Sequence, residues 1–333
     1  ERGLGDLVAR GILYSLRSGA HIINMSLGWP ADVDSNLMSQ MIDLARSRGV
    51  LVVAAAGNDG TDALIRPCIF EGVICVASHD PDGAISHFSN HGAGVDIAAP
   101  GLGILSIFPT SLTSRIFTDR VGYEQKNGTS MAAPYIAGAL ARLLNAGYSP
   151  AEAQARLLAG VRQVQPNSRV TRSKKMIVQT GNADLGLAFQ TASRPLILPT
   201  TKKPLLAKWN RLDRSISVNL ELQNQWSKAR SVTIRPEIVE QSGMPREAAV
   251  KQREIRVSSW PQNEKRSLAL DISIESTRLD SELMIALEIE SQDDKSGKTT
   301  KDLRHVAVEI VSLPSPGDRE IENKPFSGDL NLI

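Results

Sequence analysis

The spacing of apolar residues changes near residue 195, and this change constrains the fold more than any other feature of the chain. Before it, continuous apolar runs such as residues 50–56 alternate with helical patterns at residues 4–17 and 37–48. Strands that are apolar on both faces and are separated by helices are typical of a parallel sheet covered by helices. We therefore predict an α/β domain over residues 1–193.

After this point apolar residues alternate with polar ones, which is the pattern of strands with one buried face. These runs predict an antiparallel β-sandwich over residues 205–313, which either stabilises and spaces the chain or binds substrate or a cell surface. Residues 194–204, rich in Pro, Thr and Lys, predict an extended linker, and residues 314–333 predict a flexible tail. The alternating residues are Ile216, Val218, Leu220, Leu222; Leu268, Leu270, Ile272, Ile274; Leu283, Ile285, Leu287, Ile289; Val306, Val308 and Ile310.

Composition narrows the classes of function. A chain of 333 residues with 41% apolar content can bury more than one core. The charges nearly cancel, with 38 basic and 36 acidic residues, so no basic surface indicates nucleic acid or a membrane as partner. Apolar runs also fall short of the roughly 20 residues of a membrane-spanning helix.

The segment 127–134, Asn-Gly-Thr-Ser-Met-Ala-Ala-Pro, carries the clearest chemical signal. Gly128 permits an unusual φ and a close approach of the backbone to a substrate. Ser130 comes at the start of an apolar, helix-prone run, where free N–H groups and the helix dipole favour a developing negative charge. The residues therefore indicate either a nucleophilic serine or a simple serine cap on a buried helix.

This segment resembles the nucleophile segment of the subtilisin-like serine proteases (subtilases, peptidase family S8). Four further segments resemble the same family in the family's order, and together the matches cover roughly residues 4 to 192. The resemblance implies an α/β peptidase domain that acts on a protein or peptide substrate. The additional segments are residues 22–28, 57–60, 88–90 and 95–101.

The resemblance implies a role for each matching residue. Ser130 is the expected nucleophile, and the Asn58 amide is expected to bind the oxyanion, although Asn58 also fits an ordinary turn. The remaining expected substrate-binding residues form two walls of the S1 pocket and the approach to the nucleophile. The small residues of one wall, Ala55, Ala56 and Gly57, imply room for a large P1 residue, the residue whose carbonyl is attacked. They are Ser26, Leu27 and Gly28; Ala55, Ala56 and Gly57; and Asn127, Gly128 and Thr129.

A nucleophilic serine needs a general base and an orienting carboxylate, and neither family motif is present. The Asp-Thr/Ser-Gly and His-Gly-Thr-His motifs are missing, and none of the five histidines lies in a matching context. The isolated chain is therefore expected to be inactive and to need an N-terminal part of the peptidase domain as partner. Three explanations remain open: a fragment of a longer reading frame, one piece of a processed enzyme, or an inactive peptide-binding or regulatory relative.

Four further features of the sequence concern packing, the cysteines, metal binding and localisation. The family usually has His-Val where this chain has Tyr135-Ile136, a position expected to face the interior. Cys68 and Cys75 predict either a disulfide or two buried thiols. No cofactor or metal is assigned: the loops around Phe70 and Asp96 correspond to a cation-binding region in some relatives, but one carboxylate is too little for a calcium site. The resemblance implies a secreted or cell-surface protein.

Overall fold

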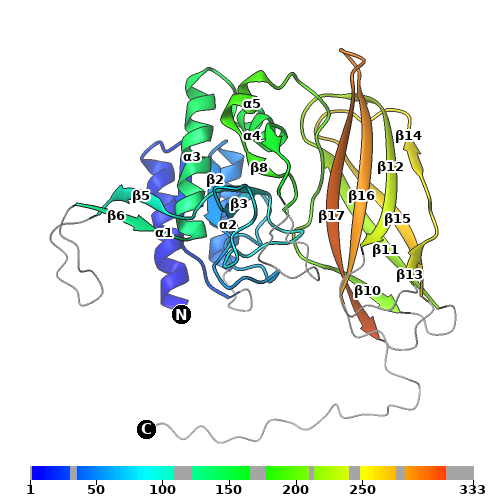
Figure 1. Ribbon diagram of the computed structural model, residues 1–333, viewed down its shortest axis with the longest axis horizontal. Helices are drawn as coiled ribbons and strands as arrows, with labels where there is room; N and C mark the ends of the chain where they lie inside the picture. The colour runs from blue at the N-terminus through cyan, green and yellow to red at the C-terminus, as the bar shows by residue number, and fades with distance from the viewer. Residues whose placement is uncertain are drawn as a thin grey trace, which may run out of the picture.

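The computed structural model describes residues 2–30, 36–108, 122–165, 178–209, 214–239, 248–274 and 282–312, so the expected tail lies outside the described residues. Figure 1 shows a helix-rich part beside a part built of long strands. The helices are α1 (Arg2–Arg17), α2 (Asn36–Ser47), α3 (Thr129–Asn145), α4 (Pro150–Ala159) and α5 (Leu185–Gln190). The strands are β1 (Ile22–Met25), β2 (Leu51–Ala55), β3 (Val73–His79), β4 (Ile97–Pro100), β5 (Ile104–Ile107), β6 (Tyr123–Lys126), β7 (Val161–Arg162), β8 (Asn182–Ala183), β9 (Ile197–Pro199), β10 (Leu205–Trp209), β11 (Ser215–Asn224), β12 (Ala229–Val239), β13 (Ala248–Val250), β14 (Ile255–Val257), β15 (Lys265–Ile274), β16 (Glu282–Asp293) and β17 (Thr299–Ser312).

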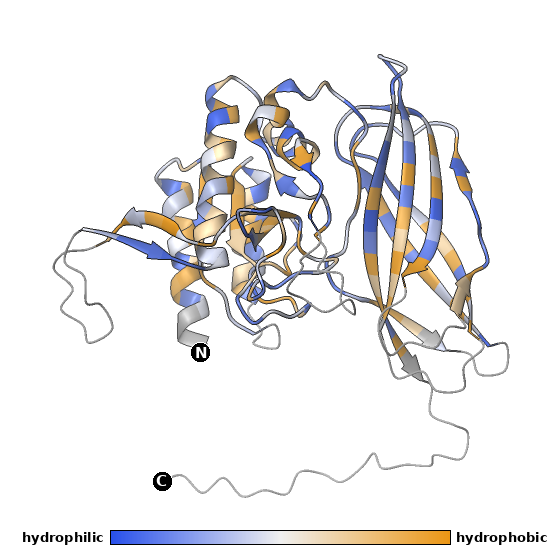
Figure 2. Ribbon diagram, viewed as in Figure 1, coloured by the Kyte–Doolittle hydropathy of each residue, from blue (hydrophilic) through white to orange (hydrophobic). Residues whose placement is uncertain are grey.

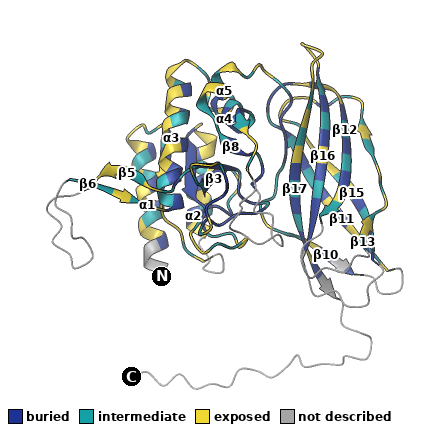
Figure 3. Cartoon of the chain, viewed as in Figure 1, coloured by how far each residue is buried: buried dark blue, intermediate teal, exposed yellow. Residues whose placement is uncertain are grey.

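The first part is built on a six-stranded sheet in the order β1-β2-β3-β4-β8-β7, in which β1 to β4 pair in parallel. Alternate residues of the strands enter two different cores. One core contains residues of α1 and α2, and the other contains residues of α3, α4 and α5, so helices cover both faces. Figure 3 shows the buried strands between partly exposed helices. The predicted helix-covered parallel sheet is therefore present.

Local sequence explains where the helices begin. Ser149 caps α4, because its side chain accepts a hydrogen bond from the Glu152 backbone N–H while Pro150 occupies the first position. Asp184 caps α5 in the same way by accepting from the Leu187 N–H. The helices predicted at residues 4–17 and 37–48 are α1 and α2, with ends shifted by at most two residues.

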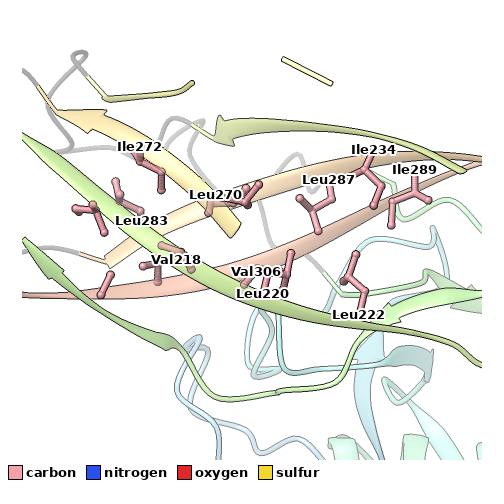
Figure 4. Close-up of a cluster of buried hydrophobic side chains, with 14 of the residues drawn as sticks. Val218, Leu220, Leu222, Ile234, Leu270, Ile272, Leu283, Leu287, Ile289 and Val306 are labelled. Carbon is pink, nitrogen blue, oxygen red and sulfur yellow. The ribbon is translucent and has the colours of Figure 1, made fainter. Parts of the chain in front are cut away.

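The second part contains two sheets, ordered β10-β17-β16-β12-β14 and β13-β15-β11-β9. Their inward residues belong to one hydrophobic cluster, and Figure 4 shows side chains from both sheets meeting there. Figure 2 shows the bands of alternating hydropathy along these strands. All four alternating runs noted in the sequence are strands. One difference from a purely antiparallel arrangement is that β10 pairs in parallel with β17.

The segment expected to be an extended linker is partly buried. Strand β9 pairs with β11, and Leu196, Ile197 and Leu198 are at most 6% exposed. Leu196, Leu198 and Trp226 belong to the same core as α3 and α4, so apolar packing continues from one part of the chain into the other. The three-residue apolar run is too short to stand out in its Pro- and Lys-rich surroundings, which is why the sequence did not indicate it.

Cys68 and Cys75 form a disulfide, which decides between the two alternatives left by the sequence. Among the described residues, no helix is long and apolar enough to cross a membrane.

Candidate active site

Ser130 lies in the first turn of α3, where the chain leaves the hairpin β5–β6 and turns into the helix. The turn requires Gly128, whose φ of 151° lies in the region that side chains disfavour. The Gly128 N–H donates to the Gly101 carbonyl at 2.8 Å, which anchors this turn to the end of β4. Ser130 is partly exposed at the protein surface.

Ser130 is held by a reciprocal contact with Ser26. The Ser26 hydroxyl donates to the Ser130 carbonyl at 2.8 Å, and the Ser130 hydroxyl donates to the Ser26 carbonyl at 3.3 Å. The Ser130 carbonyl is open to this bond because the residue four positions later is Pro134, which has no N–H to complete the helical pair. A proline inside the helix therefore couples the serine to the end of β1.

Asn58 is oriented by Thr129. The Asn58 Oδ1 accepts from the Thr129 backbone N–H at 2.9 Å and from the Thr129 hydroxyl at 3.0 Å. The Thr129 hydroxyl itself accepts from the Gly57 N–H at 3.1 Å. Because the amide oxygen takes both bonds and Asn58 is exposed, its Nδ2 group is left to donate to a ligand.

Asn90 holds the loop that carries Asn58, a role that the sequence did not reveal. Its Oδ1 accepts from the backbone N–H groups of Asp59 and Thr61 at 2.9 and 3.3 Å. Its Nδ2 donates to the Ala56 carbonyl at 3.0 Å, and its side chain is almost fully buried. The segment Phe88-Ser89-Asn90 was a visible signal, but nothing in it indicated which loop the amide would bind.

The two expected substrate walls differ in what they expose. Residues 26–28 are exposed, and Leu27 is 42% accessible. Ala55 and Ala56 instead point into the cores on opposite faces of the sheet, so their side chains do not line a surface. Gly57 follows them with φ 107° at the surface end of β2. Asn127 is exposed, and its Oδ1 accepts from the Gly103 N–H at 2.7 Å.

No histidine is among the hydrogen-bond partners of Ser130 in the described chain. His79 Nδ1 contacts the Asp80 carbonyl at 2.8 Å, and His91 Nδ1 contacts the Ser89 carbonyl at 3.3 Å. His87 is exposed and packs edge-on against Phe88. Ser130 and Asn58 are thus brought together, while these three histidines make their contacts elsewhere in the described chain.

The position Tyr135-Ile136 faces the interior only in part. Ile136 is 1% exposed and lies in the core of α3, as expected. Tyr135 is 50% exposed, so the expectation that it faces the interior is wrong. The two residues point apart because adjacent side chains on a helix are separated by about 100°.

The loop around Asp96 is closed by a lysine from the segment after α5. The Asp96 carboxylate accepts from Lys202 Nζ and from the Cys75 backbone N–H, the latter at 2.7 Å. Lys202 Nζ also donates to the Val73 carbonyl. The carboxylate considered for a cation is therefore paired with an ammonium group of the chain itself.

Comparison with known proteins gives this geometry a context. The sequence model of the subtilase family (peptidase S8) matches residues 1–183. Subtilisin BL of Lederbergia lenta is 39% identical over 140 residues, covering 42% of this chain and 48% of that protein. Thermitase of Thermoactinomyces vulgaris is 39% identical over 153 residues, covering 46% of this chain and 50% of that protein. The chain spans about half the length of these curated relatives.

Among solved structures, the self-cleaved protease domain of PatA is 32% identical, with a TM-score of 0.45 over 55% of this chain and 66% of that chain. The family match covers more than half of this chain and contains Asn58 and Ser130. The chain therefore belongs to the subtilase family.

Proposed function

We propose that this chain carries the nucleophile and oxyanion-binding half of a serine endopeptidase, with the general base and its carboxylate supplied by an N-terminal part of the peptidase domain. The observation that carries the proposal is the arrangement of Ser130 and Asn58. Ser130 lies in the first turn of α3. The Thr129 N–H and hydroxyl both donate to Asn58 Oδ1, so the Asn58 NH₂ group is left to donate. An amide donor and a helix N-terminus beside a serine are the elements that stabilise the transition state of acyl transfer.

In this mechanism Ser130 Oγ attacks the carbonyl carbon of the scissile peptide bond while a histidine of the partner segment takes its proton. The carbonyl π electrons move to the oxygen, and Asn58 Nδ2 and the Ser130 N–H donate to that oxyanion. Collapse of the intermediate breaks the C–N bond, and the histidine returns the proton to the leaving amine. Water then releases the acyl group by the same steps. Residues 26–28 hold the substrate as an added strand.

The open edge of the sheet supports a partner of this kind. Among the described residues, strand β1 lies at one edge of its sheet and pairs on one side alone, with β2. A parallel sheet buries its strands, and an unpaired edge offers backbone groups to a further strand. Ser26 and Ser130 lie at the carboxyl end of β1, so a partner strand at this edge approaches the nucleophile.

Three finer points belong to the same proposal. We infer an oxidising compartment, and hence secretion or surface display, because Cys68 and Cys75 are joined in a disulfide. We assign no structural calcium, because the Lys202 ammonium already neutralises Asp96.

We also propose that the two sheets of the second part form a β-sandwich that stabilises the peptidase part. The two sheets share one core. Leu196, Leu198 and Trp226 join this part of the chain to the core of α3 and α4.

The test restores a base by fusing the N-terminal part of a matched relative, such as subtilisin BL, to this chain. We expect the fusion to hydrolyse peptides and to react with a fluorophosphonate at Ser130, whereas the isolated chain stays near background because Ser130 remains protonated. Asn58→Ala in the fusion should lower kcat by about 10²–10³-fold with little change in KM, because the amide binds the oxyanion and not the ground state.

Asn145→Ala is the matched control, since Asn145 is exposed at the far end of α3 and should leave kcat unchanged. Asn58→Asp should be at least as harmful as the alanine variant, because it places a negative charge beside the oxyanion. If Asn58→Ala raised KM alone or unfolded the fusion, Asn58 would be a turn residue and the oxyanion assignment would be wrong.

A further inference from the structure

Two glycines on different segments present their side-chain positions to the same methyl group. A β-carbon added at Gly28 would overlap with Ile65 Cδ1, and one added at Gly57 would lie 3.1 Å from the same atom. Gly28 is the third residue after β1, and Gly57 is the second residue after β2. The Ile65 side chain therefore lies between the two walls expected to hold the substrate side chain.

The backbone around Ile65 is fixed, so this side chain cannot easily withdraw. Arg66 and Trp29 form a bridge in which each N–H donates to the other carbonyl, at 2.9 and 3.1 Å. The Ile65 carbonyl accepts from the Ile69 N–H at 3.2 Å. Cys68, three residues after Ile65, is joined to β3 by the disulfide with Cys75. Backbone hydrogen bonds and the disulfide thus hold Ile65 in its position beside Gly28.

We propose that Ile65 forms the floor of the S1 pocket and restricts the P1 residue to small side chains such as Gly, Ala and Ser. This inference rests on the proposed function of Ser130. A large P1 side chain entering between Gly28 and Gly57 needs the volume that the half-buried Ile65 already fills, and overpacking is unfavourable. The sequence alone led to the opposite expectation, because the wall residues are small and Ile65 gave no sign of its position.

The experiment measures kcat/KM of the fusion enzyme on a series of otherwise identical peptides with Ala, Leu or Phe at P1. The wild type should prefer Ala over Phe by at least about tenfold. Ile65→Ala should raise the ratio of kcat/KM for the Phe peptide to kcat/KM for the Ala peptide. Ile65→Gly removes more volume and should raise this ratio further, by at least about tenfold. Leu64→Ala is the matched control: Leu64 packs against Gly94 instead, so its variant should keep the wild-type ratio.

The outcomes separate this inference from the proposed function. If Ser130 of the fusion does not react with the fluorophosphonate, the proposed function fails before specificity is measured. If Ser130 reacts and the wild type accepts Phe as well as Ala, or if the Ile65 variants leave the ratio unchanged, the role of Ile65 is wrong. Ile65→Val removes one methylene, so it tests the same trend in case the glycine variant does not fold.

Discussion

At the residue scale, Thr129 fixes the orientation of the Asn58 side-chain amide. Its hydroxyl accepts from the Gly57 N–H and donates to Asn58 Oδ1, and its N–H donates to the same oxygen. Without the hydroxyl the amide keeps one bond of two and gains freedom to rotate. An oxyanion donor is effective only when it is oriented before the charge develops.

Thr129→Val in the fusion enzyme should therefore lower kcat by about tenfold, with KM nearly unchanged. It should also lower the free energy of unfolding by about 1–3 kcal/mol, because the Gly57 N–H loses its acceptor. Thr129→Ser keeps the hydroxyl and should restore kcat. Steady-state kinetics of the three proteins checks this, and a valine variant with wild-type kcat would show that Thr129 does not orient the amide.

At the element scale, local rules allowed most of the fold to be predicted from the sequence. The Ser149 cap marked the start of α4, and the period of two marked the long strands, because both signals lie within a few neighbouring residues. Strand β9 was missed because its burial comes from β11 and from the core of α3, which are distant in sequence. Ser130 and Asn58 were indicated by motifs, whereas Asn90 and Ile65 act only through tertiary contacts.

The loop between β3 and β4 depends on an ion pair from outside the sheet. Lys202 and Asp96 have side chains only 12% and 19% exposed, and the lysine also bonds to the Val73 carbonyl. Lys202→Met should lower the free energy of unfolding by about 1.5–3 kcal/mol, since it leaves a largely buried carboxylate without its cation. Denaturant unfolding measures this.

The double variant Lys202→Met/Asp96→Asn should recover part of that loss, because no unpaired charge then remains. Lys203→Met is the control, since Lys203 is exposed next to the pair. If added calcium stabilised the wild type strongly, the assignment of the lysine as the cation of this loop would be contradicted, because a metal would then compete for Asp96.

At the scale of the whole molecule, a buried charge cluster joins the two parts of the chain. Arg194, which follows α5, forms a two-pronged bond with Asp302 of β17 at 2.6 and 3.1 Å. Arg304, only 3% exposed, contacts Asp302 at 3.2 Å and donates to the carbonyls of Gln179 and Ile197. Gln179 in turn bonds to the His305 backbone. Polar contacts and the shared core thus fix β17 against the α/β part.

The cluster makes stability depend on pH in a defined direction. Burial would raise the pKa of Asp302, but the charges of Arg304 and Arg194 outweigh it and hold this pKa below its ordinary value. A lowered carboxylate pKa stabilises the fold above the unfolded value of about 4, and that stabilisation is lost as pH falls through the folded pKa. The Asp302 contribution should therefore be complete at neutral pH and disappear in acid.

Asp302→Asn should lower the free energy of unfolding at pH 7 by about 3–5 kcal/mol, because it leaves the buried Arg304 without its counter-charge. The difference from wild type should shrink as the pH falls from about 4 through the lowered folded-state pKa of Asp302, below which the wild-type carboxylate is neutral as well. Urea unfolding at a series of pH values measures both effects. Glu254→Gln is the control: arginine hydrogen bonds also lower the pKa of Glu254, but the side chains of its partners Arg256 and Arg235 are 81% and 40% exposed, so these ion pairs should contribute little. A difference for Asp302→Asn that stayed constant from pH 7 into acid would show that the aspartate acts through its shape and hydrogen bonds, and that its charge does not hold the two parts together.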